Sequence, residues 1–224
     1  GHPGLQEHAV VVVPVHLVVP GGDHHQVRDE SFVESIGPGV AVEAANTVAE
    51  HLQARGRGEA GTAVARARLE LAPKPRLVAV RVIFRQNRKT NSGRHFGSRL
   101  VIAPDGTLFI TVGDRGDSER AQDPFDHAGS VIRINRDGGV PSDNPFADGK
   151  KAAPEIWSIG HRNPQGATLN RSTGRVWTVE HGAQGGDEIN LPDPGRNYGW
   201  PTISYGRHYS GAKIGVGVRN AGME

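Results

Sequence analysis

A histidine and an aspartate flank a predicted β-hairpin, at positions where they could carry out proton transfer. Residues 95–116 read HFGSRLVIAPDGTLFITVGDRG, with apolar runs on both sides of a turn at 104–106. Proline presets φ and glycine accepts a positive φ, so this sequence favours a turn. His95 and Asp114 lie at nearly equal distances from the turn, and side chains facing each other across a hairpin have Cβ atoms roughly 5 Å apart. An imidazole oriented by a carboxylate can act as a general base. The alternative is a surface histidine that lies near an aspartate without a catalytic role.

The same layout recurs further along the chain. Two strand-like segments, 167–169 and 175–180, flank a second turn at 171–174. Radial repetition of such units, with polar residues at one end, favours a β-propeller. A β-sandwich is the alternative architecture.

The second hairpin brings different chemistry to its open end. With a four-residue loop, Arg162 and Asn163 are expected to oppose Ala183 and Gly182. Arginine offers a fixed fork of donors to a carboxylate or a quinone oxygen, and asparagine can donate and accept at once. The alternative is that Arg-Asn-Pro only ends a strand.

A glycine-rich segment follows, which reads EHGAQGGDEINL over 180–191. Its glycines expose backbone carbonyls, and Asp187 and Glu188 add hard carboxylate oxygens. Such oxygens suit Ca²⁺, although the glycines could simply turn the chain.

The remaining strand predictions divide the chain into two regions. In the region 59–224, alternating or apolar runs predict further strands at 62–69, 77–84, 131–134 and 155–159. The region 1–58 differs in character and is predicted to be a divergent segment of unknown fold. Within it, a strand pair over 10–13 and 15–19 around Pro14 and a helix over 40–53 are expected.

Composition excludes several functional classes. The 224 residues contain 31 glycines, 15 prolines and no cysteine, and the formal net charge is +2. Without cysteine there are no disulfides and no thiolate metal sites. No basic cluster with interleaved aromatic residues indicates nucleic-acid binding, and no apolar run reaches about 18 residues, so no membrane span is expected.

Five motifs in order carry a family resemblance: HFGSRLVIAPDG, TVGDRG, GHRNPQG, EHGAQGGDEINL and NYGWP, all between residues 94 and 205. This block resembles the soluble aldose sugar dehydrogenases of the glucose/sorbosone dehydrogenase family, which use pyrroloquinoline quinone (PQQ). The resemblance implies an all-β, six-bladed β-propeller with PQQ at the channel mouth, of which about three blades are recognisable here. It also implies that the chain is a fragment, weakly stable and inactive by itself.

The resemblance assigns roles around the cofactor. His95 matches the catalytic base and Asp114 the acid that orients it. Arg162 and Asn163 match residues that contact PQQ, with Arg162 near the reactive carbonyl, and Gln122 matches a polar cofactor contact.

Metal ligands are implied in the same way. Gly182 and Ala183 match two positions whose main-chain carbonyls hold an active-site Ca²⁺, the second being often proline in the family. Glu188 and Tyr198 match positions of a further, structural Ca²⁺ site.

The activity implied is oxidation of the anomeric carbon of an aldose, with hydride transfer to PQQ and His95 as the base. The implied partners are an aldose sugar and an external electron acceptor, and the implied location is periplasmic or secreted. Two alternatives are a Ca²⁺-dependent, lactonase-like propeller hydrolase and a non-catalytic propeller that serves in binding.

Overall fold

The computed structural model describes residues 9–16, 59–70 and 76–224, and within them the chain is built from β-strands and one short 3₁₀ helix. The elements in chain order are β1 (Ala9–His16), β2 (Thr62–Glu70), β3 (Arg76–Arg85), β4 (Leu100–Ile102), β5 (Leu108–Val112), η1 (Ser118–Gln122), β6 (Ser130–Ile134), β7 (Ile156–Ile159), β8 (Pro164–Asn170), β9 (Arg175–Glu180) and β10 (Glu188–Asn190). The all-β prediction is confirmed. No helix in these ranges is long and apolar enough to cross a membrane.

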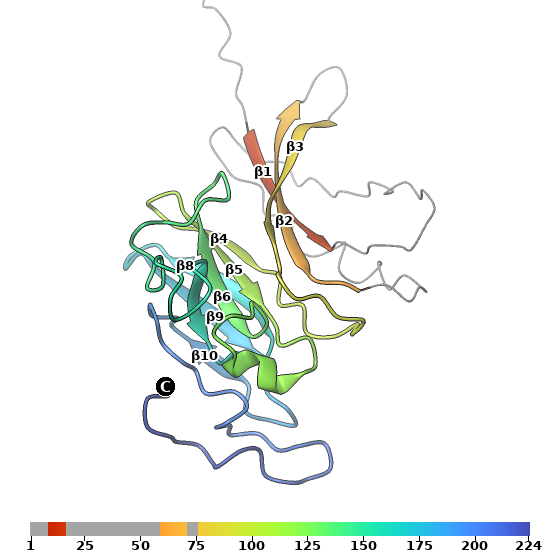
Figure 1. Cartoon of the computed structure of the whole chain (residues 1–224), viewed down its shortest axis with the longest axis vertical. Coiled ribbons are helices and arrows are strands. Elements are labelled where there is room, and N and C mark those ends of the chain that lie inside the picture. The colour runs from red at the N-terminus through yellow and green to blue at the C-terminus, as the bar shows by residue number, and fades with distance from the viewer. Residues whose placement is uncertain (1–8, 17–58, 71–75) are drawn as a thin grey trace, which may run out of the picture.

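The strands form three antiparallel sheets, each a meander of consecutive strands (Figure 1). Their orders are β1-β2-β3, β4-β5-β6-β7 and β10-β9-β8. Successive meanders that pack face against face are adjacent blades of a β-propeller. The described residues therefore form a partial propeller whose ring is not closed.

The middle sheet, β4–β7, is covered on both faces. On one face Leu108 and Ile132 pack in a cluster that includes Val64 and Phe84 of the first sheet. On the other face Phe109, Val131 and Trp157 pack against Val176 of β9, together with Leu169 of β8. Every residue of β5 is consequently buried, which explains its nearly continuous apolar sequence.

The first hairpin has the predicted register. Leu100 pairs with Ile110 and Ile102 with Leu108, and the turn lies at 104–106. This pairing places the residues before β4 and after β5 at one end of the sheet.

The second hairpin contains a β-bulge that the sequence did not reveal. Asn170 pairs with Arg175 as predicted for a four-residue loop, but the register shifts between Pro164 and Gly166. Pro164 pairs with Glu180 as a result. The bulge moves the expected partners of Arg162 and Asn163 by one residue, because one residue of β8 is left unpaired.

Two other predictions change. The strand pair expected around Pro14 is wrong, because β1 is one strand that continues through this proline and pairs with β2. Proline is tolerated there because β1 lies at the edge of its sheet.

The glycine-rich segment ends in β10, a strand that was not predicted. The helix expected over 40–53 lies outside the described residues.

Candidate active site

His95 and Asp114 meet at the open end of the first hairpin, as the turn geometry predicted. The distance from His95 Nδ1 to Asp114 Oδ1 is 2.6 Å. The Asp114 side chain is buried, whereas 19% of the His95 side chain is exposed. An ionised carboxylate can only accept, so Nδ1 carries the proton and Nε2 is the nitrogen free to accept one.

The Asp114 carboxylate receives two more N–H donors. The backbone N–H of Gly116 donates to Oδ1 at 2.7 Å, and the indole Nε1–H of Trp200 donates to Oδ2 at 2.8 Å. Hydrogen bonds to a charged acceptor are the stronger class. Together they hold the carboxylate in one orientation beneath the imidazole.

The backbone around His95 is held in an unusual conformation. His95 has φ of 50°, a left-handed value that is uncommon outside glycine and tends to occur at functional sites. Gly97 donates its N–H to Asn163 Oδ1 at 3.1 Å. Gly113 lies so close that a methyl group there would be 2.2 Å from the His95 carbonyl oxygen. The backbone on either side of His95 is therefore fixed by the close approach of Gly113 and by the Asn163 side chain of the second hairpin.

Arg115 supports the segment that precedes His95. Its guanidinium lies over the Phe96 ring, 3.3 Å from the centroid, and donates to the carbonyls of Arg94 and Ser92. Burial, with a smaller contribution from nearby Arg120, lowers the pKa of Arg115 to about 10. Sequence reasoning missed this residue, although its place next to Asp114 in the TVGDRG motif was a signal.

Arg162 lies on the second hairpin with a free donor. Its Nη1 donates to the carbonyls of His181 at 3.0 Å and Gly182 at 2.9 Å. The buried Nε–H finds no hydrogen-bond partner among the described residues. Because a buried donor without a partner is costly, this N–H suits an anionic or carbonyl group of a ligand.

Glu180, which sequence reasoning also missed, organises the loop that carries Arg162. Its Oε2 accepts the backbone N–H groups of Arg162 at 2.6 Å and Asn163 at 3.3 Å. Its Oε1 accepts from His161 Nδ1 and Asn190 Nδ2, both at 2.9 Å. This carboxylate is buried, so its four hydrogen bonds offset the cost of desolvation.

Gln122, predicted as a cofactor contact, uses its side chain within the protein. Its Nε2 donates to Asn197 Oδ1 at 3.0 Å and to the Trp200 carbonyl at 2.7 Å. Its Oε1 accepts from Asn197 Nδ2 at 2.7 Å. Contact with a cofactor stays a prediction for this residue.

The carbonyls predicted to bind the active-site Ca²⁺ already have partners. The Gly182 carbonyl accepts from Arg162, and the Ala183 carbonyl accepts from the Arg207 N–H at 2.9 Å. Each oxygen keeps a second lone pair, but a cation at Gly182 would have to share that carbonyl with a guanidinium. The described residues contain no cluster of three His, Asp or Glu side chains that could hold a metal. Ca²⁺ at these carbonyls therefore stays a prediction.

The residues predicted for the structural Ca²⁺ site have separate partners. Glu188 Oε2 accepts from Asn190 at 3.2 Å, and the Tyr198 hydroxyl donates to the Leu191 carbonyl at 2.6 Å. Burial, and after it the charge of Glu180, raises the pKa of Glu188. The structure gives no contact between Glu188 and Tyr198, and this site also stays a prediction.

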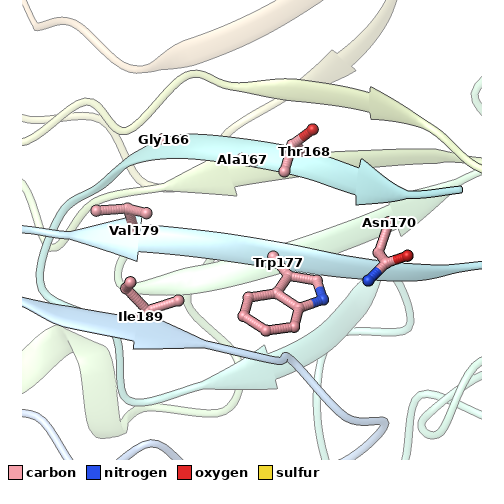
Figure 2. A pocket seen from close by; sticks show the side chains of 7 residues that line it. All are labelled: Gly166, Ala167, Thr168, Asn170, Trp177, Val179 and Ile189. Carbon is pink, nitrogen blue, oxygen red and sulfur yellow. The ribbon is translucent and has the colours of Figure 1, made fainter. Parts of the chain in front are cut away.

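An apolar groove of about 490 Å³ lies elsewhere, on the β8–β10 sheet. Figure 2 shows Trp177, Val179 and Ile189 side by side on that sheet. On β9, Trp177 and Val179 alternate with Val176, which packs against the middle sheet, so the groove is on the face of this sheet that points away from the middle sheet. It contains none of the polar site residues.

Three comparisons with known proteins agree. The family described as Glucose / Sorbosone dehydrogenase matches residues 46–224. The chain is 45% identical over 157 residues to aldose sugar dehydrogenase YliI of Escherichia coli, which covers 70% of this chain and 42% of that protein. A crystal structure of a glucose dehydrogenase superposes with a TM-score of 0.72 at 46% identity, covering 75% of this chain and 49% of that one.

A PQQ-bound aldose sugar dehydrogenase from Streptomyces coelicolor has a TM-score of 0.58 at 29% identity, over 71% of this chain and 48% of that one. The chain thus spans less than half the length of each of these relatives.

Proposed function

The chain belongs to the glucose/sorbosone dehydrogenase family, and on this premise we propose that it carries the base and part of the cofactor site of a PQQ-dependent aldose dehydrogenase. The observation that carries the proposal is the pair His95–Asp114 beside Arg162. One group is prepared to take a proton, and the other has a buried N–H without a partner among the described residues. The PQQ-bound relative supports this choice of cofactor.

The residues present fit a bound quinone. Arg162 would direct its free Nε–H at a cofactor oxygen, and Asn163 would contact the cofactor from the same loop. PQQ, when bound, supplies an electron-accepting quinone for the hydride of the sugar. Ca²⁺ held by the carbonyls of Gly182 and Ala183 belongs to the proposal, and it would share the Gly182 carbonyl with the Arg162 guanidinium.

His95 performs the proton transfer. Its Nε2 takes the proton of the anomeric hydroxyl while Nδ1–H stays bonded to Asp114. As the imidazole becomes cationic, the buried carboxylate stabilises its charge. Asp114 also keeps the tautomer in which Nε2 is free.

A chimera tests the proposal. Residues 94–205 replace the matching segment of the E. coli aldose sugar dehydrogenase, and PQQ binding is measured by quenching of tryptophan fluorescence. We expect Arg162→Ala to weaken binding by about tenfold or more, since a hydrogen bond to a charged group contributes roughly 1.5–3 kcal/mol. Arg175→Ala is the control, because Arg175 pairs with Asp193 on the surface. Equal affinities of the two variants would overturn the assignment of Arg162.

Location and turnover complete the proposal. We propose a periplasmic or secreted enzyme that passes its electrons to an external acceptor. Fractionation of cells would test the location, and dye reduction would test the electron transfer.

We expect the 224-residue chain alone to show no turnover, since it spans less than half of its relatives. Dye-linked aldose oxidation by this chain with PQQ and Ca²⁺ would contradict that expectation.

A further inference from the structure

The Trp200 side chain contacts both Asp114, the partner of His95, and Arg162. Its indole Nε1–H donates to Asp114 Oδ2 at 2.8 Å, across 86 positions of sequence. Its ring lies 5.3 Å from the central guanidinium carbon of Arg162. A guanidinium at this distance from an indole face is attracted by the ring quadrupole.

The indole completes the hydrogen bonding of the carboxylate. Asp114 Oδ1 accepts from His95 and from the Gly116 N–H, while Oδ2 accepts from Trp200. Asp114 is 1% exposed, so without the indole a buried, charged oxygen would lack this partner. The cost of that loss would favour a rotated carboxylate.

We propose that Trp200 is a positioning residue. Its N–H fixes the Asp114 carboxylate so that Oδ1 faces His95, and the imidazole proton thereby stays on Nδ1. Its ring packs against Arg162 at the same time, so one side chain sets the relative placement of base and guanidinium. This inference rests on the proposed function, in which Nε2 of His95 is the proton acceptor.

The loop around Trp200 is fixed firmly enough for this role. The Trp200 N–H donates to the Gly160 carbonyl at 3.0 Å, and the Trp200 carbonyl accepts from Gln122 Nε2 at 2.7 Å. Gln122 also exchanges two amide hydrogen bonds with Asn197. The Gln122 side chain therefore holds the Trp200 backbone in place.

Ring-nitrogen NMR of the 224-residue chain tests the inference at alkaline pH. We expect His95 in the Nδ1–H tautomer, and in Trp200→Phe we expect the tautomer ratio to fall about tenfold, as loss of a hydrogen bond to a charged group implies. Trp157→Phe is the matched control, because Trp157 donates to the Pro192 carbonyl at the same 2.8 Å. A ratio in Trp200→Phe equal to that of the control would overturn the proposal.

A second measurement leaves Trp200 unaltered, in case the phenylalanine variant does not fold. His95 and Trp200 donate to different oxygens of Asp114. In Asp114→Asn one of these oxygens becomes an N–H₂ group, so one of the two donors would face another donor. We expect the Trp200 indole N–H to exchange with solvent about tenfold faster, or the His95 tautomer to switch, while exchange at Trp157 is unchanged. If neither occurs, Trp200 does not position Asp114.

Neither measurement uses PQQ or sugar. The chimera can therefore fail to bind PQQ while the NMR measurements confirm the role of Trp200. Conversely, the chimera can bind PQQ while the NMR measurements contradict the role of Trp200.

Discussion

The backbone N–H of Asp114 donates to the carbonyl oxygen of Arg162 at 2.8 Å. This bond joins the open ends of the two hairpins, directly beside the Asp114 and Arg162 side chains. The Asp114 side chain turns to His95, and the Arg162 side chain turns to the Gly182 carbonyl. This main-chain contact joins the segments that carry His95's partner Asp114 and Arg162, so changes that separate the hairpins should disturb both sites.

At Gly113, the addition of a single methyl group should be enough to push the hairpins apart. A methyl group there would lie 2.2 Å from the His95 carbonyl and 2.9 Å from Asn163 Oδ1. We expect Gly113→Ala to destabilise the chain by about 1–3 kcal/mol, because overpacking forces the backbone to shift. Urea unfolding measures this.

Gly93→Ala is the matched control, since its methyl group meets no atom of the described residues within 4 Å. Equal unfolding midpoints for the two variants would show that the hairpins are not closely packed at Gly113.

Glu180 is expected to be essential for the loop that carries Arg162. Glutamine keeps the shape but replaces one acceptor oxygen by an N–H₂ group, which would face a donor in a site with four N–H groups. Glu180→Gln should lower the free energy of unfolding by about 1–3 kcal/mol, since a buried donor loses its partner. Thermal denaturation at neutral pH checks this, and an unchanged midpoint would contradict it.

Replacing Glu188 by glutamine should raise the free energy of unfolding, in contrast to the same change at Glu180. Burial, followed by the charge of Glu180, raises the pKa of Glu188, so the folded chain binds this proton more tightly than the unfolded chain. The ionised form therefore destabilises the fold above the folded-state pKa, and the penalty disappears as pH falls below the unfolded-state pKa. Glu188→Gln should raise stability at neutral pH by up to about 1 kcal/mol. In acid it should have no effect, and a gain that is equal at both pH values would refute the cause.

Arg133 is expected to hold the middle sheet to its loops. It is buried and donates to Asp143 at 2.9 and 3.2 Å and to Asp105 at 2.7 Å. Burial opposes its charge, but the hydrogen bonds to Asp143 and Asp105 outweigh it and raise the pKa of Arg133. Lysine cannot reproduce this fork, so Arg133→Lys should cost about 1–3 kcal/mol in urea unfolding.

The exposed Arg136 provides the comparison. It donates from Nε to the Gly106 carbonyl at 3.1 Å on the surface, so Arg136→Lys should change stability by less than about 0.5 kcal/mol. Losses of similar size in both variants would contradict the special role of Arg133.

The sequence predicted the features that depend on neighbouring residues, such as turns and hairpin pairing. The turn at 104–106 and the apolar runs beside it were sufficient to place His95 opposite Asp114, because a tight turn fixes the pairing of its strands. The second hairpin has the predicted register from Gly166 to Asn170, but its open end was misplaced by one residue, since nothing in the sequence marks the bulge between Pro164 and Gly166. β10 was hidden because the glycines before it indicated a loop.

Long-range contacts account for the residues that were missed. Trp200 reaches Asp114 across 86 positions, and Glu180 accepts N–H groups from the loop before β8 and from Asn190 of β10. Such contacts depend on how the blades pack, which hydrophobic periodicity does not encode. The motif NYGWP showed that this loop matters but not what its tryptophan touches.

Aldose oxidation by the chimera with His95→Gln tests most directly whether His95 is the base. We expect the unaltered chimera to oxidise aldoses with a dye as acceptor, and His95→Gln to slow turnover at least about 100-fold, the lower range for loss of a general base. PQQ binding should stay within about twofold, because His95 lies on the first hairpin and Arg162 on the second. Turnover of His95→Gln at the rate of the unaltered chimera would contradict the role of His95, as would a folded, PQQ-binding chimera that oxidises no aldose.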